Sequence, residues 1–401
     1  MSMTTKPQFW KWAIVSVVFR LILIYSPKNL NLATRPEVST PIISLRWLAE
    51  GYWLTQSSMS PYAGSIYHGS PLLLSVLGPL TVKKIEGHPY HLLWSLVSVI
   101  ADFISAMLIQ ETGFNLRMAY CERLKLLGLG KLFEVSEILS SEDIAALVYL
   151  WNPFTIVTCV GFNTTPVENL FIILLLYGVC IRVAPLAAFG WVIVSHLSLY
   201  PTILIIPKDE DDSSSKHRLV NDLTEQKSFS WRLVGLFFVR VFIWTLYTLV
   251  LCSIFMRNYG GLSEVFSRTY GLILTVKDLS PNIGVLWYFF AKVFEFFRDF
   301  FLIVFHVNIL FTILPLVGDS ALYLALLALF FNELAEMQFS FFLFCGYVGV
   351  SLLSVVMHNL WIWRGTGNAN FYFATGMAYA CFQCESMLNH DRKIRKLVAA
   401  S

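Results

Sequence analysis

The sequence predicts an all-α protein that crosses a membrane many times. Of the 401 residues, 56% are hydrophobic, 15% are aromatic and only 14% are charged, whereas charged residues make up about 25% of an ordinary soluble domain. Apolar blocks also recur from one end of the chain to the other, and several approach the ~20 residues that cross a bilayer as a helix. We therefore expect roughly ten to twelve membrane helices within a single polytopic domain, residues 1–401.

The apolar blocks differ in length, and blocks of ~10–14 residues are more often re-entrant or buried than spanning. We interpret Pro71–Val82 as re-entrant, although Lys83 and Lys84 after it favour a crossing. In chain order the blocks are Trp10–Tyr25, Pro71–Val82, His91–Ile109, Ile144–Val160, Val167–Ile181, Val183–Ile206, Leu233–Phe255, Gly284–Phe294, Leu302–Leu316, Ala321–Phe331, Phe339–Val356 and Phe371–Met387.

The first apolar block has the features of a retained signal anchor. Trp10–Tyr25 lies close to the N-terminus with Lys6 before it and Lys11 at its start, and no small-residue cleavage site comes after it. The loop Ser26–Ser70 then faces the lumen. Lys and Arg favour the cytoplasmic side of short loops, so the expected cytosolic parts are the stretch Arg117–Lys131, the polar segment 207–232 and the polar tail 388–401.

The luminal loop is expected to carry an amphipathic helix and a first set of candidate residues. In STPIISLRWLAEGYWL the apolar residues at 42, 43, 47, 48 and 52–54 have helical spacing, and Ser39 or Thr40 fits the N-cap. Such a helix lies along a membrane surface. Tyr62 and His68 follow in SPYAGSIYHGSP, either as interfacial aromatic anchors or as part of a glycolipid headgroup site.

A second set of candidates lies in the aromatic stretch VKDLSPNIGVLWYFFAKVFEFFRDFF. The Ser-Pro-Asn-Ile-Gly core predicts a turn and a helix start. The aromatic residues after it fall on all faces of the helix, which is typical of a helix buried in lipid or between neighbours. The Glu, Arg and Asp of FEFFRDF either pair at the helix end or line a water-filled cavity. The binding candidates here are Asn282, Trp287 and Tyr288.

A third set interrupts the apolar run near the end of the chain, in HNLWIWRGTGNANFYFA. The two glycines prevent a helix from simply continuing, the arginine can face a phosphate, and each asparagine offers a donor and an acceptor that suit sugar hydroxyls. The alternative is an interfacial helix–helix turn capped by its asparagines. The candidates of this set are His358, Trp361, Trp363, Arg364, Asn368, Asn370 and Phe371.

The sequence carries no motif for several other kinds of function. There is no nucleotide-binding loop, nucleophile elbow or HExxH, and Cys381 and Cys384 form a CxxC without further ligands for a metal. We expect no cofactor, no metal and no catalytic residue. The net charge of +3 is too small to indicate a nucleic-acid partner. The sequon at Asn163 lies in a short connection and is expected to be bare.

Five stretches taken together resemble one membrane-protein family. RPEVSTP, MSPYAGSIYHGSPLL, LSPNIGVLWYFFAKVFEFF, VGDSALYLALL and HNLWIWRGTGNANFYFA occur in the order of the PIG-U subunits of glycosylphosphatidylinositol (GPI) transamidase, and they span nearly the whole chain. The resemblance implies a multi-pass protein of the endoplasmic reticulum membrane with a GT-C-like arrangement of helices. It also implies a complex that joins the carboxyl end of a precursor to a GPI lipid.

Within such a complex a separate cysteine-protease subunit does the chemistry, and the PIG-U subunit recognises the lipid. The implied partners are therefore the other transamidase subunits, including the cysteine protease, and the GPI glycolipid. Two other functions remain open. One is a GT-C mannosyltransferase with Glu37 as general base; the other is a lipid transporter or scramblase, which short broken helices would suit.

The chain departs from the family pattern at one point. The family carries a further apolar stretch between HVNILFTILPL and VGDSALYLALLALF, whereas here Leu316 runs directly into Val317. Losing one crossing would invert every later segment unless local packing holds the last helices in place. This departure raises the question of which side of the membrane Asn368 and Asn370 lie on.

Overall fold

The structure is a computed structural model. It describes residues 7–25, 44–64, 66–81, 91–126, 140–198, 231–271, 317–331 and 340–382, together with the single positions 32, 202, 287, 288, 292 and 297. The segments 207–232 and 388–401, which the sequence assigns to the cytosol, lie outside these ranges apart from the first two residues of a helix at 231.

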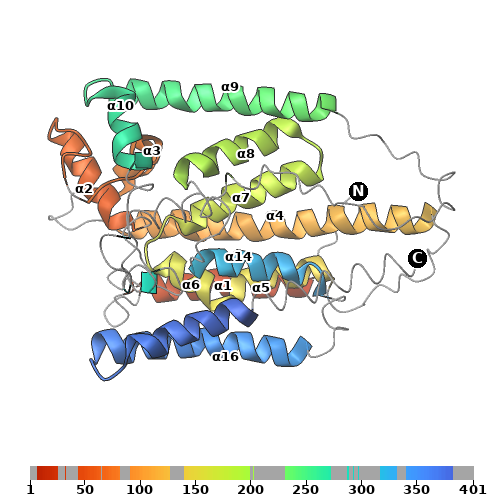
Figure 1. Ribbon diagram of the computed structural model, residues 1–401. Coiled ribbons are helices and arrows are strands. Elements are labelled where there is room, and N and C mark those ends of the chain that lie inside the picture. The colour runs from red at the N-terminus through yellow and green to blue at the C-terminus, as the bar shows by residue number, and fades with distance from the viewer. Residues whose placement is uncertain are drawn as a thin grey trace.

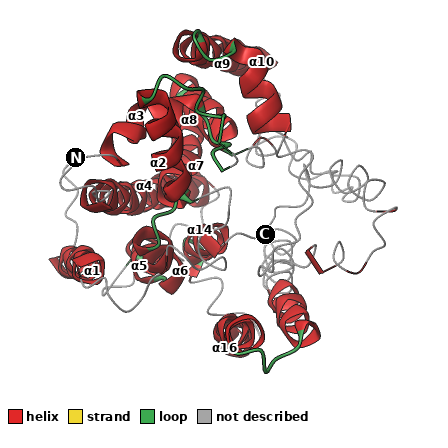
Figure 2. Cartoon of the chain, turned by 90° about the vertical axis from the view of Figure 1, so that its left-hand side faces the viewer, coloured by secondary structure: helices red, strands yellow, loops and turns green. Residues whose placement is uncertain are grey.

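The described residues form a bundle of long helices that run roughly side by side (Figures 1 and 2). The helices are α1 (Pro7–Tyr25), α2 (Leu45–Gln56), α3 (Pro71–Thr81), α4 (His91–Leu126), α5 (Ser141–Trp151), α6 (Pro153–Val160), α7 (Thr165–Cys180), α8 (Ala184–Leu197), α9 (Trp231–Met256), α10 (Gly261–Val265), α14 (Val317–Ala328) and α16 (Ser340–His358), with π-helical turns η4 (Phe266–Tyr270) and η5 (Asn359–Trp363). A further helix covers residues 369–382.

Four of the described helices are long and apolar enough to cross a membrane. They contain the stretches Gln8–Tyr25, Leu93–Ala119, Val234–Met256 and Phe341–Trp363, and the bent pair α5 and α6 makes a fifth if it is counted as one span. The predicted all-α, multi-pass class is confirmed. The expected ten to twelve helices include ranges outside the described residues, so that number stays a prediction.

The block Ile144–Val160 is one apolar run in the sequence but two helices in the structure. Asn152 separates α5 from α6, and the two helices are bent by 45°. Pro153 causes the break because it has no N–H for the carbonyl of Tyr149 and its ring crowds that carbonyl. Asn152 accepts a hydrogen bond from the Phe154 N–H at 2.9 Å, so the first turn of α6 is capped by its own side chain.

The predicted amphipathic helix is confirmed as α2. Leu45, Leu48 and Leu54 are buried, whereas Trp53 is 57% exposed. The proposed caps at 39 and 40 lie outside the described residues. α2 packs against α3, which has 11 residues and an internal Pro79. At about 1.5 Å per residue α3 is too short to cross a bilayer, so its re-entrant interpretation stands as a prediction.

α4 is longer than the apolar block from which it was expected. It has 36 residues and continues to Leu126, so the first part of the expected loop Arg117–Lys131 is helical. This correction has a physical reason, because Arg117 is held beside the start of α5 by an ion pair with Glu142 at 2.5 Å. A neighbour that pairs the charge lets the helix extend beyond the apolar run.

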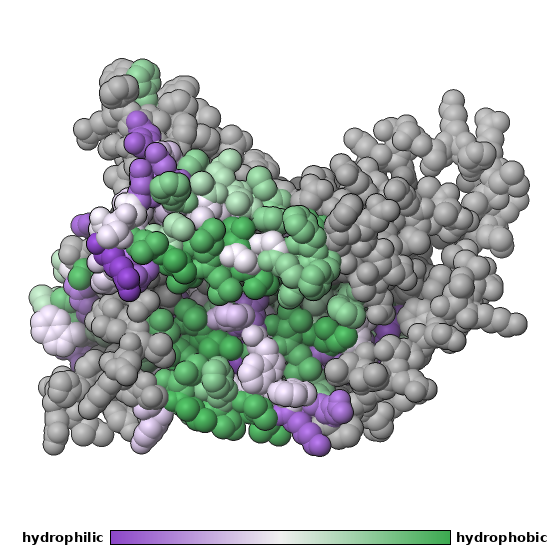
Figure 3. All heavy atoms as spheres, turned by 90° about the horizontal axis from the view of Figure 1, so that it is seen from below, coloured by the Kyte–Doolittle hydropathy of each residue, from purple (hydrophilic) through white to green (hydrophobic). Residues whose placement is uncertain are grey.

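The binding candidates that fall within the described residues all lie at one end of the bundle, which we call the 57–70 end. It holds the connection 57–70 between α2 and α3, the turn 257–260 after α9, and the connection that follows α16 (Figure 1). The start of α9 and the end of α4 lie at the opposite end. Seen from below, a broad hydrophobic area covers the middle of the molecule and hydrophilic residues gather mostly at its margins (Figure 3).

The central core is formed where α1, α4, α5, α7 and α14 meet, with members such as Ile109, Tyr149 and Ala325 fully buried. α8 lies against α7 at backbone distance. A Cβ added to Gly190 would be 2.8 Å from the backbone nitrogen of Leu175 and 3.0 Å from the carbonyl oxygen of Phe171. The two helices can therefore approach this closely only because residue 190 has no side chain.

The replacement Gly190→Ala is expected to lower the free energy of unfolding by about 1–3 kcal/mol, because overpacking must push α7 and α8 apart. Gly235→Ala is the matched control: a Cβ there meets nothing within 4 Å, and alanine favours an exposed helix by up to about 1 kcal/mol. Thermal melting of the purified protein should place Gly190→Ala below the wild type and Gly235→Ala at or above it. Equal melting temperatures would contradict the close approach.

Candidate functional site

Two segments that are distant in the sequence meet at the 57–70 end: one contains Trp287 and Tyr288, and the other is 358–373. The Trp287 ring stacks on Trp361 with centroids 5.5 Å apart and an interplanar angle of 26°, and it lies 5.7 Å from the ring of Tyr372. The His358 ring packs edge-on against Tyr372 at 5.2 Å. Trp287, Tyr372 and His358 are almost fully buried. We call these four side chains the aromatic floor.

Tyr288 joins the two segments a second time. Its hydroxyl donates a hydrogen bond to Oδ1 of Asn370, its ring stacks on Phe373 with centroids 4.2 Å apart, and the Lys292 ammonium lies 5.6 Å from its centroid. The predicted candidates Trp287 and Tyr288 are therefore in direct contact with the predicted candidates of the last apolar region.

The connection after α16, which we call the 359–370 turn, is closed by its own backbone. The N–H groups of Thr366 and Gly367 both donate to the carbonyl of Leu360 at 3.0 Å, and Gly365 has a positive φ of 64° that suits glycine. Oδ1 of Asn368 accepts from the N–H of Asn370 at 3.0 Å. The capping alternative is thus correct for Asn368, because its side chain caps the N-terminus of the helix 369–382.

The polar members of the 359–370 turn remain available to a ligand. Arg364, Asn368 and Asn370 are exposed, and beside them Trp363 and Phe371 are 54% and 65% exposed. Exposed amides and a guanidinium therefore lie in the same turn as exposed aromatic side chains, close in sequence to the mostly buried aromatic floor. This combination can hydrogen-bond a polar headgroup and contact the apolar chains attached to it.

Tyr62 and His68 belong to a different cluster. The Tyr62 ring stacks on Tyr67 at 5.6 Å, and its hydroxyl donates to the carbonyl of Gly69 at 3.0 Å. Nδ1 of His68 lies 3.2 Å from the carbonyl oxygen of Arg268. The Tyr62 hydroxyl also lies 3.3 Å from Oγ1 of Thr269, so Tyr62 and His68 fasten the 57–70 connection to η4. Asn282, Glu37, Cys384 and the charged residues of FEFFRDF lie outside the described residues.

A buried histidine links the same connection to three helices. Nε2 of His196, in the last turn of α8, lies 2.7 Å from Oγ of Ser70, and its Nδ1 lies 2.6 Å from the Tyr270 hydroxyl. Sγ of Cys252 on α9 is 3.4 Å from the same Nε2. Burial raises the pKa of Tyr270 to about 12 and those of Tyr62 and Tyr67 well above their usual range, so these phenols stay protonated donors.

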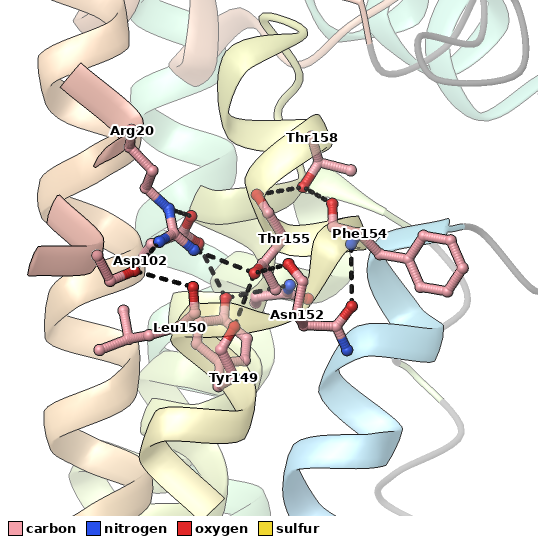
Figure 4. Close-up of polar contacts among 10 residues, drawn as sticks. Arg20, Asp102, Tyr149, Leu150, Asn152, Phe154, Thr155 and Thr158 are labelled. Atoms are coloured by element: carbon pink, nitrogen blue, oxygen red, sulfur yellow. Dashed lines mark hydrogen bonds and ion pairs between the residues drawn. The ribbon is translucent and has the colours of Figure 1, made fainter. Parts of the chain in front are cut away.

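A buried ion pair at the centre of the bundle was missed at the sequence level (Figure 4). Nε of Arg20 on α1 lies 3.5 Å from Oδ2 of Asp102 on α4, and both side chains are about 1% exposed. Nη2 of Arg20 donates to Oγ1 of Thr155 at 3.1 Å, and Nη1 donates to Oγ of Ser16. The signal was present, because Arg20 is the only charge in the interior of the first apolar block, after Lys11 at its start, and Asp102 is the only carboxylate in the block His91–Ile109.

The same polar groups satisfy the backbone that Pro153 disrupts. Oγ1 of Thr155 donates to the carbonyl of Tyr149 at 2.7 Å, which is the carbonyl that Pro153 cannot bond. Oγ of Ser16 on α1 donates to the carbonyl of Leu150 at 3.0 Å. The break between α5 and α6 is thus stabilised by side chains of α1 and α6, as broken helices inside membranes require.

The sequence similarity of this chain to known proteins shows the family to which it belongs. The family model described as GPI transamidase subunit PIG-U matches residues 14–317 and 314–379, which is most of the chain. The chain belongs to the PIG-U family. It is 28% identical over 403 residues to the GPI-anchor transamidase component PIGU of Homo sapiens, covering 91% of this chain and 88% of that protein.

Fungal PIG-U relatives are also similar along most of their length. The GPI transamidase component GAB1 homolog of Schizosaccharomyces pombe is 25% identical over 387 residues, with 86% of this chain and 83% of that protein covered. The GPI transamidase component GAB1 of Saccharomyces cerevisiae is 24% identical over 374 residues with the same coverage. The resemblance stated from the five motifs is confirmed, and the protein is a GPI transamidase subunit.

The two PIG-U matches meet within residues 314–317, where the sequence departs from the family. This division supports the predicted loss of a segment. α14 begins at Val317 and packs against α5, α6 and α7. α16 then runs toward the 57–70 end (Figure 1), so Asn368 and Asn370 lie at the same end of the bundle as Tyr62 and His68.

The replacement Arg20→Leu is expected to lower the free energy of unfolding by about 3–5 kcal/mol, because it leaves Asp102 buried without its counter-charge. The double replacement Arg20→Leu with Asp102→Leu should recover much of this loss, since two apolar side chains need no pairing. Thermal melting of the purified protein distinguishes the three forms. Arg240→Leu, at an exposed position of α9, is the control and should melt like the wild type. A double variant that is less stable than either single variant would contradict the pairing.

Proposed function

We propose that this chain recognises the GPI lipid and positions it for attachment within the transamidase, in the endoplasmic reticulum membrane. The chemistry is assigned to a separate cysteine-protease subunit, as the family resemblance implies, and this chain supplies no catalytic residue. The observation that carries the proposal is the contact of Trp287 and Tyr288 with the 359–370 turn, which joins exposed hydrogen-bonding groups to the aromatic floor.

The chemistry of the turn suits a phosphorylated glycan. A guanidinium binds phosphate oxygens through charge-assisted hydrogen bonds, and the side-chain amides of Asn368 and Asn370 offer donors and acceptors to sugar hydroxyls. On the neighbouring surface of α16, Leu352, Val355 and Val356 are at least half exposed. Acyl chains attached to the headgroup can lie along these side chains, which would otherwise face bulk lipid.

The orientation in the membrane is part of the proposal. The 57–70 end is assigned to the lumen, because the sequence indicates that the first helix is a signal anchor followed by a luminal loop. Both the headgroup of a GPI lipid awaiting transfer and the precursor terminus must meet on one side of the membrane. With α16 running toward the 57–70 end, the 359–370 turn would be on that side despite the missing segment.

Replacing Asn368 and Asn370 together with leucine is expected to reduce GPI attachment. Loss of two amide hydrogen bonds at about 0.5–1.5 kcal/mol each weakens binding by about 5- to 150-fold. The measurement is the surface level of a GPI-anchored reporter in cells whose own PIG-U subunit is removed and replaced by each variant, with protein level followed in parallel. Asn258→Leu, at an exposed position in the turn after α9, is the matched control and should restore the reporter fully.

Asn368 also caps a helix, so a second variant separates folding from binding. Asn368→Asp keeps the oxygen that accepts from the Asn370 N–H but removes the amide donor and adds a negative charge opposite a phosphate. We expect normal protein level with reduced attachment. Full attachment with both the double leucine variant and Asn368→Asp would contradict the proposed lipid site.

Orientation is tested by a new glycosylation sequon. Ser58→Asn creates Asn-Met-Ser in the 57–70 connection, at an exposed position with a φ of 59°, which asparagine tolerates better than most residues. A luminal 57–70 end predicts a mobility shift that endoglycosidase removes. The native sequon is the internal control, because Asn163 is fully buried and should stay bare. Gln56→Asn creates Asn-Ser-Ser at another exposed position, without a proline after the sequon. Absence of the shift in both variants would place the 57–70 end in the cytosol.

A further inference from the structure

One face of α4 is polar although it is buried inside the bundle. Ser95, Ser98, Asp102 and Ser105 follow one another at spacings of three and four residues, which places them on the same face of a helix. Their exposed fractions are 1%, 0%, 1% and 0%. They lie within the stretch Leu93–Ala119 that can cross a membrane, where buried polar groups mark function by default.

α7 presents matching polar groups to this face. The two helices pack side by side and run in the same direction (Figure 1). Nδ2 of Asn169 on α7 donates to the Tyr149 hydroxyl at 3.3 Å, and this hydroxyl donates to Oδ1 of Asp102 at 3.0 Å. Ser98 precedes Asp102 by four residues, and Thr165 precedes Asn169 by four, so both lie about 6 Å further toward the 57–70 end.

Several of these polar atoms lack a partner. Oγ of Ser98, Oγ1 of Thr165, Oδ1 of Asn169 and Nε1 of Trp94 are buried and accept or donate no hydrogen bond among the described residues. The four residues are at most 3% exposed. Leaving such groups unbonded in an apolar interior is costly, and buried polar groups without protein partners are ordinarily bridged by water. We call the row formed by Trp94, Ser98, Asp102, Thr165 and Asn169 the α4 polar seam.

We propose that the α4 polar seam binds a short row of ordered water molecules inside the membrane part of the bundle. The row extends from the indole N–H of Trp94 past the hydroxyls of Ser98 and Thr165 to the Asp102 carboxylate and the free amide oxygen of Asn169. Water fits because the unpartnered groups are both donors and acceptors and, apart from Asp102, are uncharged. An anion fits poorly, because the donors of Arg20 are directed to Ser16, Thr155 and Asp102.

The waters would have a definite role at the inner end of the seam. Oδ2 of Asp102 is 3.5 Å from Nε of Arg20 and has no hydrogen bond among the described residues. A water at the end of the row donates to this oxygen and so reduces the cost of burying the charge pair. The seam is therefore a hydration site for the ion pair that joins α1 to α4, independent of the lipid site.

Hydroxyl-radical footprinting of the purified complex tests the proposal directly, because radiolysis of a bound water oxidises the side chains beside it even when they are buried. Trp94 is expected to be oxidised severalfold more than Tyr379, an equally buried aromatic residue on the helix 369–382. Oxidation of Trp94 should fall when Ser98→Leu fills the seam. Equal, background-level oxidation of Trp94 and Tyr379 would overturn the proposal.

Melting temperatures give an independent test that does not require the larger substitution to fold. If water bridges Ser98 and Thr165, the double replacement Ser98→Ala with Thr165→Val removes partners from bound water and lowers the melting temperature. If the seam is dry, the same change removes two unsatisfied hydroxyls and raises it. An unchanged or higher melting temperature overturns the proposal. Val99→Ala, at a buried apolar position of α4, calibrates the effect of lost packing alone.

Discussion

The fold depends on one requirement, that a charge inside an apolar bundle must meet an opposite charge. Arg20 would oppose insertion of α1 among the other helices if it stayed alone. Its contact with Asp102 at 3.5 Å, together with its bonds to Thr155 and Ser16, fixes the depth and rotation of α1 against α4 and against the break between α5 and α6. Much of the rest of α1 faces outward, with Trp12, Ile14 and Ile22 more than half exposed, so the polar contacts determine where the helix docks.

Hydrophobic runs predict helices well in such a chain because every spanning segment must satisfy its backbone internally. The blocks correctly located α1, α7, α8, α9 and α16, and the spacing within the first loop located α2. The bend at Asn152 was hidden because hydropathy does not register a single proline in an apolar run. The length of α4 was missed because its last part is polar and is held by the pair of Arg117 with Glu142. The bend at Asn152 and the length of α4 depend on contacts between segments that are distant in the sequence.

The sequence indicates individual candidate residues but not which of them come together in the fold. Interruptions of the apolar runs drew attention to Trp287, Tyr288, Asn368 and Asn370, whose role in binding stays a prediction, and the structure adds that they contact one another. Tyr62 and His68 share the same chemical character, yet their partners are in the 57–70 connection and η4. Arg20 and Asp102 were overlooked because they lie in blocks that are distant in the sequence, and only the packing of α1 on α4 brings the two charges together.

The central claim is that the 359–370 turn receives the lipid headgroup, and a cryo-EM reconstruction of the assembled transamidase with GPI lipid present tests it most directly. We expect headgroup density within hydrogen-bonding distance of Asn368 and Asn370 beside Trp361, with acyl density along the exposed side of α16. Headgroup density beside Tyr62 and His68, or on another subunit while the 359–370 turn stays empty, would contradict it.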